Sequence, residues 1–194
     1  MSTNHLDTSG SNRRSTGRLL ASSVLALAVW GLIASSVHAQ NPYTWNNGTT
    51  QSFNGNWTVH GNWRDDGNGI GIPPSSATTQ LAFAGTGDYT TTNTAGTFVL
   101  NRLTSTNSGL VLLDGSNLRF DGDSPLLAQT VANTAFNVSN NIRLENDTTF
   151  RAINGGVLNI GVAVGGQVDL NRNNIRLDVG ANSTTFSRLA SASS

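Results

Sequence analysis

Few side chains in the sequence can carry out acid–base, nucleophilic or metal chemistry. The 194 residues hold no cysteine and three histidines, and two of these histidines precede residue 40, so the remainder offers only His60. A Ser-His-Asp triad would have to use it, and no Gly-x-Ser-x-Gly turn presents a nucleophilic serine. A zinc site needs three or four Cys, His or carboxylate ligands, and one histidine does not favour such a site.

Paired carboxylates are the other candidates for chemistry. They occur at Asp65-Asp66 and at Asp121-Gly122-Asp123. Such pairs bind calcium in some proteins and act as acid and base in glycosidases. Neither pair has EF-hand spacing, and aspartate is common in turns without any ligand. We therefore predict turn carboxylates, with no metal, no cofactor and no enzyme activity.

Three tryptophans suggest binding instead. Trp45, Trp57 and Trp63 lie close together among asparagines and glycines. If the indoles are exposed, they form a carbohydrate-binding site, because aromatic faces stack on sugar rings and asparagine amides bond to hydroxyls. If they are buried, they cover the open end of a stack of strands, since tryptophan is large and apolar with one polar group. Both interpretations stay open, and the first implies an extracellular glycan as partner.

A repeated phrase indicates the elements that must position these residues. Asn-Asn-Ile-Arg-Leu followed by an acidic residue occurs at 140–145 and again at 173–178. A repeat with a period of about 33 residues is typical of stacked supersecondary units. The sequence thus predicts a coil of the same length as this repeat, with about three short strands in each coil.

Alternation within the phrase predicts strands with one dry face. Ile142 and Leu144 alternate with Arg143 and Glu145, so that every second side chain is apolar. We expect an all-β fold, a parallel β-helix-like β-solenoid with an aromatic-rich N-terminal cap, in which asparagines of successive phrases stack as a ladder. Two strands of a β-sandwich are the alternative.

The middle of the chain gives two further expectations. Residues 110–113 and 118–120 are apolar and alternating and flank an Asp-Gly-Ser-Asn turn, a pattern that predicts a hairpin. Residues 126–135 are the least strand-like part, and either a short helix or an irregular loop fits them.

The N-terminal segment 1–39 has the pattern of a secretory signal. Three arginines precede an apolar run that ends in Val-His-Ala, which predicts cleavage between Ala39 and Gln40. An uncleaved membrane anchor is the alternative. We divide the chain into a signal peptide (1–39), a Trp/Asn/Gly-rich cap region (40–92) and a β-strand repeat region (93–194) that is incomplete at its C-terminus.

Composition restricts partners and environment. Without the segment 1–39, eight arginines face ten acidic residues, a formal charge of −2. This near-neutral balance argues against nucleic-acid binding. An exported chain without cysteine takes its stability from strand pairing and packing rather than from disulfides.

The opening of the region after the signal resembles a known family. Trp45, Trp57, Asn62-Trp63, Pro73-Pro74 and Leu81-Ala82-Phe83 are similar to the start of autotransporter-associated β-strand repeat proteins, and the two strands at 140–160 resemble their repeat. The resemblance implies a β-helical, non-enzymatic, passenger-like region of a secreted or outer-membrane bacterial protein. Such proteins end in a β-barrel or a sorting segment, and we expect neither within these 194 residues.

Together these observations predict an exported structural or adhesive β-repeat segment at the bacterial surface, in the periplasm or in the medium. Membrane contact would come only through the signal or through a missing C-terminal anchor. The alternatives are a secreted carbohydrate-binding module and a polysaccharide-acting β-helix enzyme.

Overall fold

The computed structural model describes residues 42–45, 55–65, 69–161 and 166–181. The chain divides into two compact units, Met1–His38 and Ala39–Ser194. All described residues belong to the second unit. It is an all-β solenoid, as the alternation predicted, and no described helix is long and apolar enough to cross a membrane.

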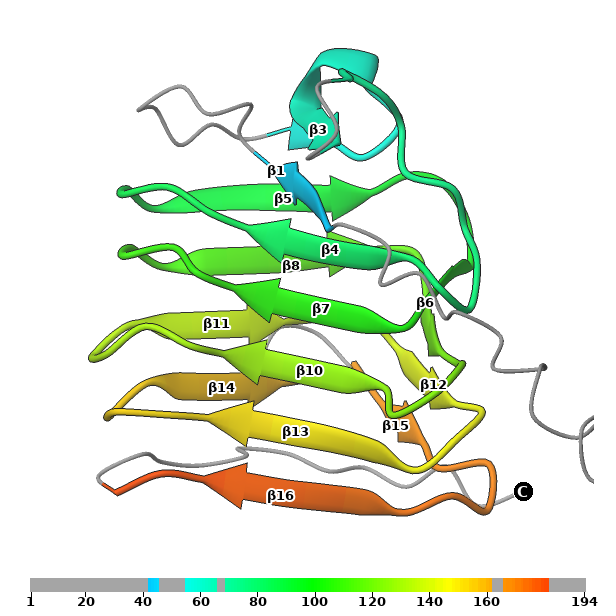
Figure 1. Cartoon of the computed structure of the whole chain (residues 1–194), viewed down its shortest axis with the longest axis vertical. Coiled ribbons are helices and arrows are strands. Elements are labelled where there is room, and N and C mark those ends of the chain that lie inside the picture. Colours follow the sequence, from blue (N-terminus) through cyan, green and yellow to red (C-terminus); the bar gives the residue numbers. More distant parts are fainter. Residues whose placement is uncertain (1–41, 46–54, 66–68, 162–165, 182–194) are drawn as a thin grey trace, which may run out of the picture. The chain divides into compact units, whose positions relative to one another are not determined.

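The strands form three sheets, which we call A, B and C (Figure 1). In spatial order, sheet A contains β3 (Trp63–Asp65), β1 (Tyr43–Trp45), β4 (Gln80–Phe83), β7 (Arg102–Ser105), β10 (Leu126–Gln129), β13 (Thr148–Ala152) and β16 (Ile175–Val179). Sheet B contains β2 (Gly55–Asn56), β5 (Tyr89–Asn93), β8 (Val111–Gly115), β11 (Ala135–Val138) and β14 (Val157–Ile160). Sheet C contains β6 (Phe98–Leu100), β9 (Leu118–Phe120), β12 (Ile142–Leu144) and β15 (Val168–Asp169).

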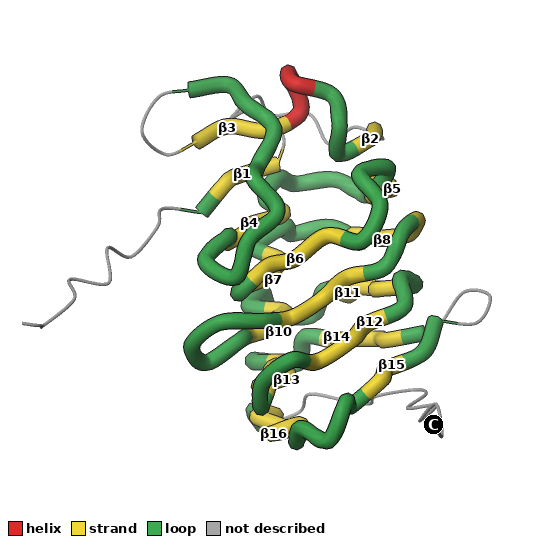
Figure 2. The backbone as a smooth tube through the Cα atoms, turned by 90° about the vertical axis from the view of Figure 1, so that its right-hand side faces the viewer, coloured by secondary structure: helices red, strands yellow, loops and turns green. Residues whose placement is uncertain are grey.

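From β4 onward the chain passes through sheets A, B and C in turn and then begins the next coil. Each strand pairs in parallel with its equivalent one coil later, and Figure 2 shows the sheet C strands one below another. The coil length is not constant: the coil that brings Arg102 beside Gln80 is shorter than the one that brings Ile175 beside Thr148. Strands this short join at tight corners, which suits a chain rich in glycine and asparagine.

The core is a narrow column of inward-facing side chains. Phe120, Phe136 and Phe150 are fully buried, one from each sheet. The predicted dry face of the phrase is confirmed, since Ile142 and Leu144 are buried while Arg143 between them is exposed. In the strands that lie between two neighbouring coils, every second residue thus meets the core, so a narrow core suffices for many coils.

Asparagine amides close the corner between sheets B and C. The Nδ2 of Asn140 donates to the carbonyl oxygens of Asp114 (2.8 Å) and Ser116 (2.7 Å) in the preceding coil. The Nδ2 of Asn93, on the other side, donates to the same Ser116 oxygen at 3.2 Å. Buried main-chain groups at a corner have no sheet partner, so these amides satisfy them.

Asparagines contact each other between coils, but those of the two phrases do not stack as predicted. The Nδ2 of Asn159 donates to the Oδ1 of Asn137 (2.8 Å), and the Nδ2 of Asn141 donates to the Oδ1 of Asn117 (3.2 Å). Asn173 instead donates to the carbonyl of Leu144.

The repeated phrase predicted one coil for each repeat of about 33 residues, and this prediction is wrong. The first copy of the phrase lies in β12 of sheet C, where Ile142 pairs with Leu118 and Val168. The second copy lies in β16 of sheet A, where Ile175 pairs with Thr148. The two copies are more than one coil apart and do not stack. Alternation suits any sheet of the solenoid, so a repeated strand pattern does not identify its partner.

Two other expectations are also corrected. Strands β8 and β9 do not form a hairpin, because they belong to different sheets and the turn between them is a corner. Of residues 126–135, only 130–134 form the expected loop, because 126–129 form strand β10 in the middle of sheet A and Ala135 begins β11. In both places parallel pairing with neighbouring coils overrides the local pattern.

The N-terminal end of the stack breaks the parallel rule. Strand β3 pairs antiparallel with β1, so that Trp45 lies opposite Trp63. The 3₁₀ turn η1 (His60–Asn62) leads into β3. Regular stacking begins at β4, inside the predicted cap region.

Candidate functional site

The three tryptophans form a cluster inside the N-terminal end. Trp45, Trp57 and Trp63 expose 0%, 1% and 0% of their surface. The ring centroid of Trp63 lies 4.9 Å from that of Trp45 and 5.6 Å from that of Trp57, both edge to face. All three pack on Phe83. Edge-to-face pairs add stability beyond the area they bury.

Two of the indole N–H groups donate hydrogen bonds to groups in or beside the cluster. Trp57 Nε1 donates to Thr91 Oγ1 at 2.9 Å, and Trp63 Nε1 donates to the carbonyl of Trp57 at 3.1 Å. The cluster therefore covers the end of the core, as the cap interpretation expects. None of the three indole faces is open to a sugar ring, so sugar stacking at these residues would require the end of the solenoid to open.

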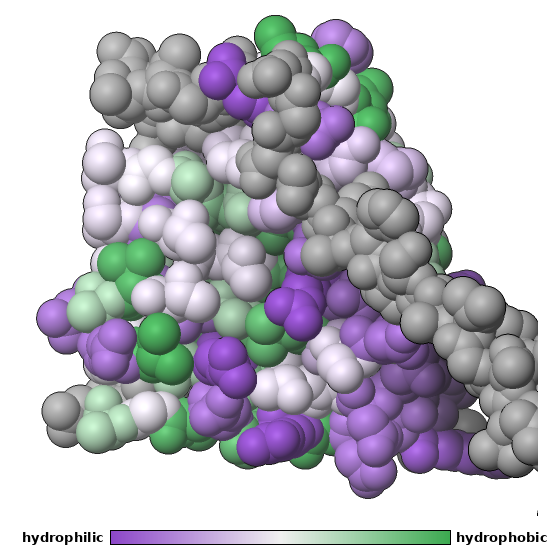
Figure 3. Space-filling model, in the orientation of Figure 1, coloured by the Kyte–Doolittle hydropathy of each residue, from purple (hydrophilic) through white to green (hydrophobic). Residues whose placement is uncertain are grey.

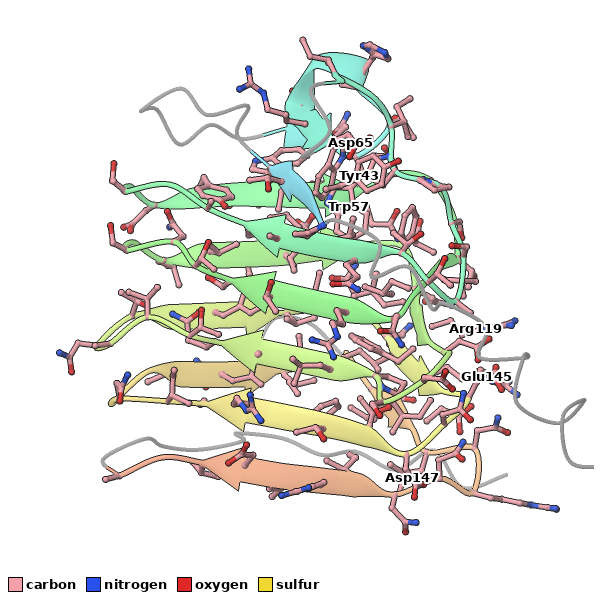
Figure 4. All side chains as sticks on the ribbon, viewed as in Figure 1. Tyr43, Trp57, Asp65, Arg119, Glu145 and Asp147 are labelled. Atoms are coloured by element: carbon pink, nitrogen blue, oxygen red, sulfur yellow. The ribbon has the colours of Figure 1, made fainter. Side chains whose placement is uncertain are left out.

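The predicted chemical candidates lie apart from one another. His60 is exposed in η1, and Asp65 ends β3 (Figure 4). Asp121 follows β9; its Oδ1 accepts from the N–H of Gly122 (2.7 Å) and its Oδ2 from Arg119 (3.3 Å), while Asp123 is exposed. Within the described residues no group of three or more His, Cys, Asp or Glu could hold a metal. Asp66 and the expected cleavage site at Ala39 and Gln40 lie outside the described residues.

Tyrosines show the only displaced pKa values among the described groups. Burial raises the pKa of Tyr89, whose hydroxyl donates to the Ala84 carbonyl at 3.2 Å. Burial, and then the negative charge of Asp65 opposite it in the strand pair, raise the pKa of Tyr43. Both effects favour the neutral phenol, so neither tyrosine is prepared as a base or nucleophile at neutral pH.

The polar groups gather instead on the outer face of sheet C. Successive strands place Val99, Arg119, Arg143 and Asp169 in one column. Hydrophilic residues dominate the lower right of the surface in Figure 3, over the corner where sheet C leads into sheet A. We call the column together with Asp121 and Glu145 the charged face; Arg119 and Glu145 are labelled in Figure 4.

Glu145 joins the two stacked arginines. Its Oε1 lies 3.0 Å from Arg143 Nε and 3.4 Å from Arg119 Nε. Its Oε2 accepts from Asn171 Nδ2 at 2.7 Å. Arg143 also approaches Asp169 at 3.8 Å. The arginines of adjacent strands would repel each other without these carboxylates, so the network sets their positions while leaving both side chains partly exposed.

Two depressions flank Arg143 on this face. One, of about 410 Å³, is lined by Thr97, Asn117, Leu118, Arg119, Arg143 and Glu145. The other, of about 260 Å³, is lined by Asn117, Asn141, Ile142, Arg143, Gln167 and Asp169. Guanidinium and amide groups with free donor positions can hydrogen-bond to hydroxyl or carboxylate groups of a ligand. The arrangement is suited to recognition by hydrogen bonds.

The repeated phrase did not reveal this face, because a stack of its two copies would place Arg143 beside Arg176, and Arg176 lies on sheet A beside Thr149. A sequence pattern that could have indicated the face is an arginine between two apolar residues, which occurs at 118–120 and again at 142–144. Comparison of the chain with models of known protein families, with curated proteins and with solved structures finds no match.

Proposed function

We propose that the chain is an exported, non-catalytic segment of a bacterial surface or secreted protein, with a structural and adhesive role. The observation that carries this proposal is the charged face, on which two successive coils present stacked arginines joined by Glu145. A solenoid presents such rows along its side, where many weak contacts add up. The signal-like N-terminal segment supports export.

Export has a direct test. The 194-residue chain is expressed in a Gram-negative host, the cells are fractionated, and the N-terminus of the product is sequenced. We expect processed protein that begins at Gln40, outside the cytoplasm, and unprocessed protein for Ala39→Arg, because signal peptidase requires a small residue before the cut. Intact protein confined to the cytoplasm would refute export.

Adhesion is tested with beads that carry the processed protein. We expect retention on bacterial cells or extracellular matrix that falls several-fold for Arg119→Gln/Arg143→Gln, since the charged face then lacks its cations. Arg102→Gln on sheet A is the matched control and keeps wild-type retention. Equal retention of all three proteins would exclude the charged face, and turnover of any polysaccharide during incubation would refute a non-catalytic role.

The depressions beside Arg143 favour one second candidate, binding of a neutral polysaccharide by the charged face rather than by the tryptophans. Amide, guanidinium and carboxylate groups that line these depressions can donate to and accept from sugar hydroxyls. Titration calorimetry with a neutral extracellular polysaccharide should show saturable binding that is reduced by Arg143→Gln. Binding that also quenches or shifts tryptophan fluorescence would point back to the N-terminal cluster.

A further inference from the structure

Within the described residues, the C-terminal edge of sheet A has no strand beside it. Strand β16 is last in its sheet and pairs only with β13 within the described part of the chain. Leu177 and Val179 continue core positions, since they lie in register with the buried Phe150 and Ala152. They are nevertheless 49% and 44% exposed. An edge strand with exposed apolar residues is a template for another strand.

The main-chain groups that face this edge can be identified. The carbonyl of Asn174 accepts from the N–H of Thr148, and the N–H of Gly180 donates to the carbonyl of Ala152. Both therefore point toward β13, and main-chain groups in a strand alternate in direction. It follows that Ile175, Leu177 and Val179 direct their N–H and C=O groups away from β13, to the open edge.

The side chains of β16 have a symmetry that matches this edge. The strand reads Ile175-Arg176-Leu177-Asp178-Val179, with an apolar residue at its centre, opposite charges on either side and apolar residues at both ends. If two copies pair antiparallel about Leu177, Arg176 of each lies opposite the partner's Asp178. Leu177 faces the partner's Leu177, and Ile175 faces the partner's Val179.

Hydrogen bonding and charge thus select the same register. The three residues with outward main-chain groups pair with one another, and the charged residues fall at the pairs without hydrogen bonds, where side chains lie closest. Both charged groups have capacity for the contact. Arg176 is exposed and forms no ion pair within the described residues, and both bonds from Arg151 go to one oxygen of Asp178, Oδ2.

We propose that the chain forms a tail-to-tail dimer with two-fold symmetry through antiparallel pairing of β16. The opposite edge of sheet A does not compete, because residues 69–71 cross the outer side of β3: the N–H of Asp65 donates to the Gly69 carbonyl (2.7 Å) and that of Gly71 to the Trp63 carbonyl (3.3 Å). Tail-to-tail pairing therefore closes at two copies. An edge as short as β16 buries less than the roughly 1,200 Å² of a stable interface, so the dimer is weak and concentration-dependent.

The test uses charge reversal in the 194-residue chain after processing in the host, followed by sedimentation equilibrium over a range of concentrations. We expect wild-type mass to rise toward two protomers, and Arg176→Asp and Asp178→Arg each to dimerise at least about tenfold more weakly, because like charges then face each other. An equimolar mixture of the two variants should regain the dimer, since every facing pair is again opposite in charge. Arg102→Asp, away from the edge, is the matched control.

The register has its own test, since the chain has no cysteine. Under mild oxidation Leu177→Cys should form a covalent dimer, because this residue faces itself. Val179→Cys should not, because it faces Ile175. Wild-type protein that is monomeric at every concentration, a folded mixture that fails to regain the dimer, or equal cross-linking of both cysteine variants would overturn the proposal. These results do not depend on export or adhesion.

Discussion

The two ends of the solenoid differ in how the apolar core is covered. At the N-terminal end, an antiparallel strand and three buried tryptophans close the core. At the C-terminal end, Leu177 and Val179 continue core positions but stay about half exposed in the described structure. Every coil needs a neighbour on both sides to bury its apolar residues. Among the described residues, large aromatic rings replace that neighbour at the N-terminal end and not at the C-terminal end.

The sharpest way to break this comparison is to remove an indole from the closed end. Trp57→Ala should lower the free energy of unfolding by about 3–5 kcal/mol, because it leaves a cavity against Phe83 and Phe98 and leaves Thr91 without its donor. Urea unfolding followed by circular dichroism measures the loss. Trp57→Phe, which fills most of the space, should lose much less, and a loss below about 1 kcal/mol for the alanine variant would contradict the cap.

A corner in the middle of the stack gives an intermediate case. Asn140→Ala should cost about 1–3 kcal/mol, because the carbonyls of Asp114 and Ser116 lose a buried donor. Asn141→Ala is the matched control: its bonds to Asn117 and Gln167 also join coils but are exposed to water, so its loss should change stability by a few tenths of a kcal/mol. The same urea experiment compares them, and equal effects would mean that burial does not strengthen the bonds of the corner amide.

Alkaline pH tests the coil next to the closed end. Tyr89 is neutral when folded and its pKa is raised above the usual value of about 10, so its contribution is complete below that pH. As pH rises above about 10, the unfolded chain ionises first and stability falls by up to about 1.4 kcal/mol per pH unit. Thermal melts between pH 8 and 11 should show this fall, and Tyr89→Phe should reduce it. If the stability of Tyr89→Phe falls with pH as steeply as that of the wild type, another group causes the fall.

Shortening an apolar side chain should cost least stability at the C-terminal end. Leu177→Ala is expected to cost at most about 1 kcal/mol at concentrations where the chain is monomeric, because half of the side chain already contacts water. Leu127→Ala, in the same column but fully buried, is the comparison and should cost about 2–5 kcal/mol. Similar losses for the two would show that the C-terminal end is also covered.

The candidate site was only partly accessible from sequence. The clustering of the tryptophans was visible, and the cap interpretation agrees with their burial, but alternation could not show whether their faces meet solvent. The charged face was not predicted, because Arg119 and Arg143 come together only through the register between β9 and β12. The register differs between sheets and coils, so no fixed period in the sequence reveals it.

The sequence by itself determined the strand type and its faces. Alternation of apolar with polar or charged residues assigned Ile142 and Leu144 to the core and Arg143 to the surface, and the absence of cysteine required stability from packing. Only the tertiary structure decided which strand lies beside which. The reason is that coil length depends on corner geometry, as at Gly122, where φ is +84° and a Cβ would lie 2.1 Å from the Ala77 carbonyl oxygen. Such corners are fixed by contact with the neighbouring coil, which no local pattern records.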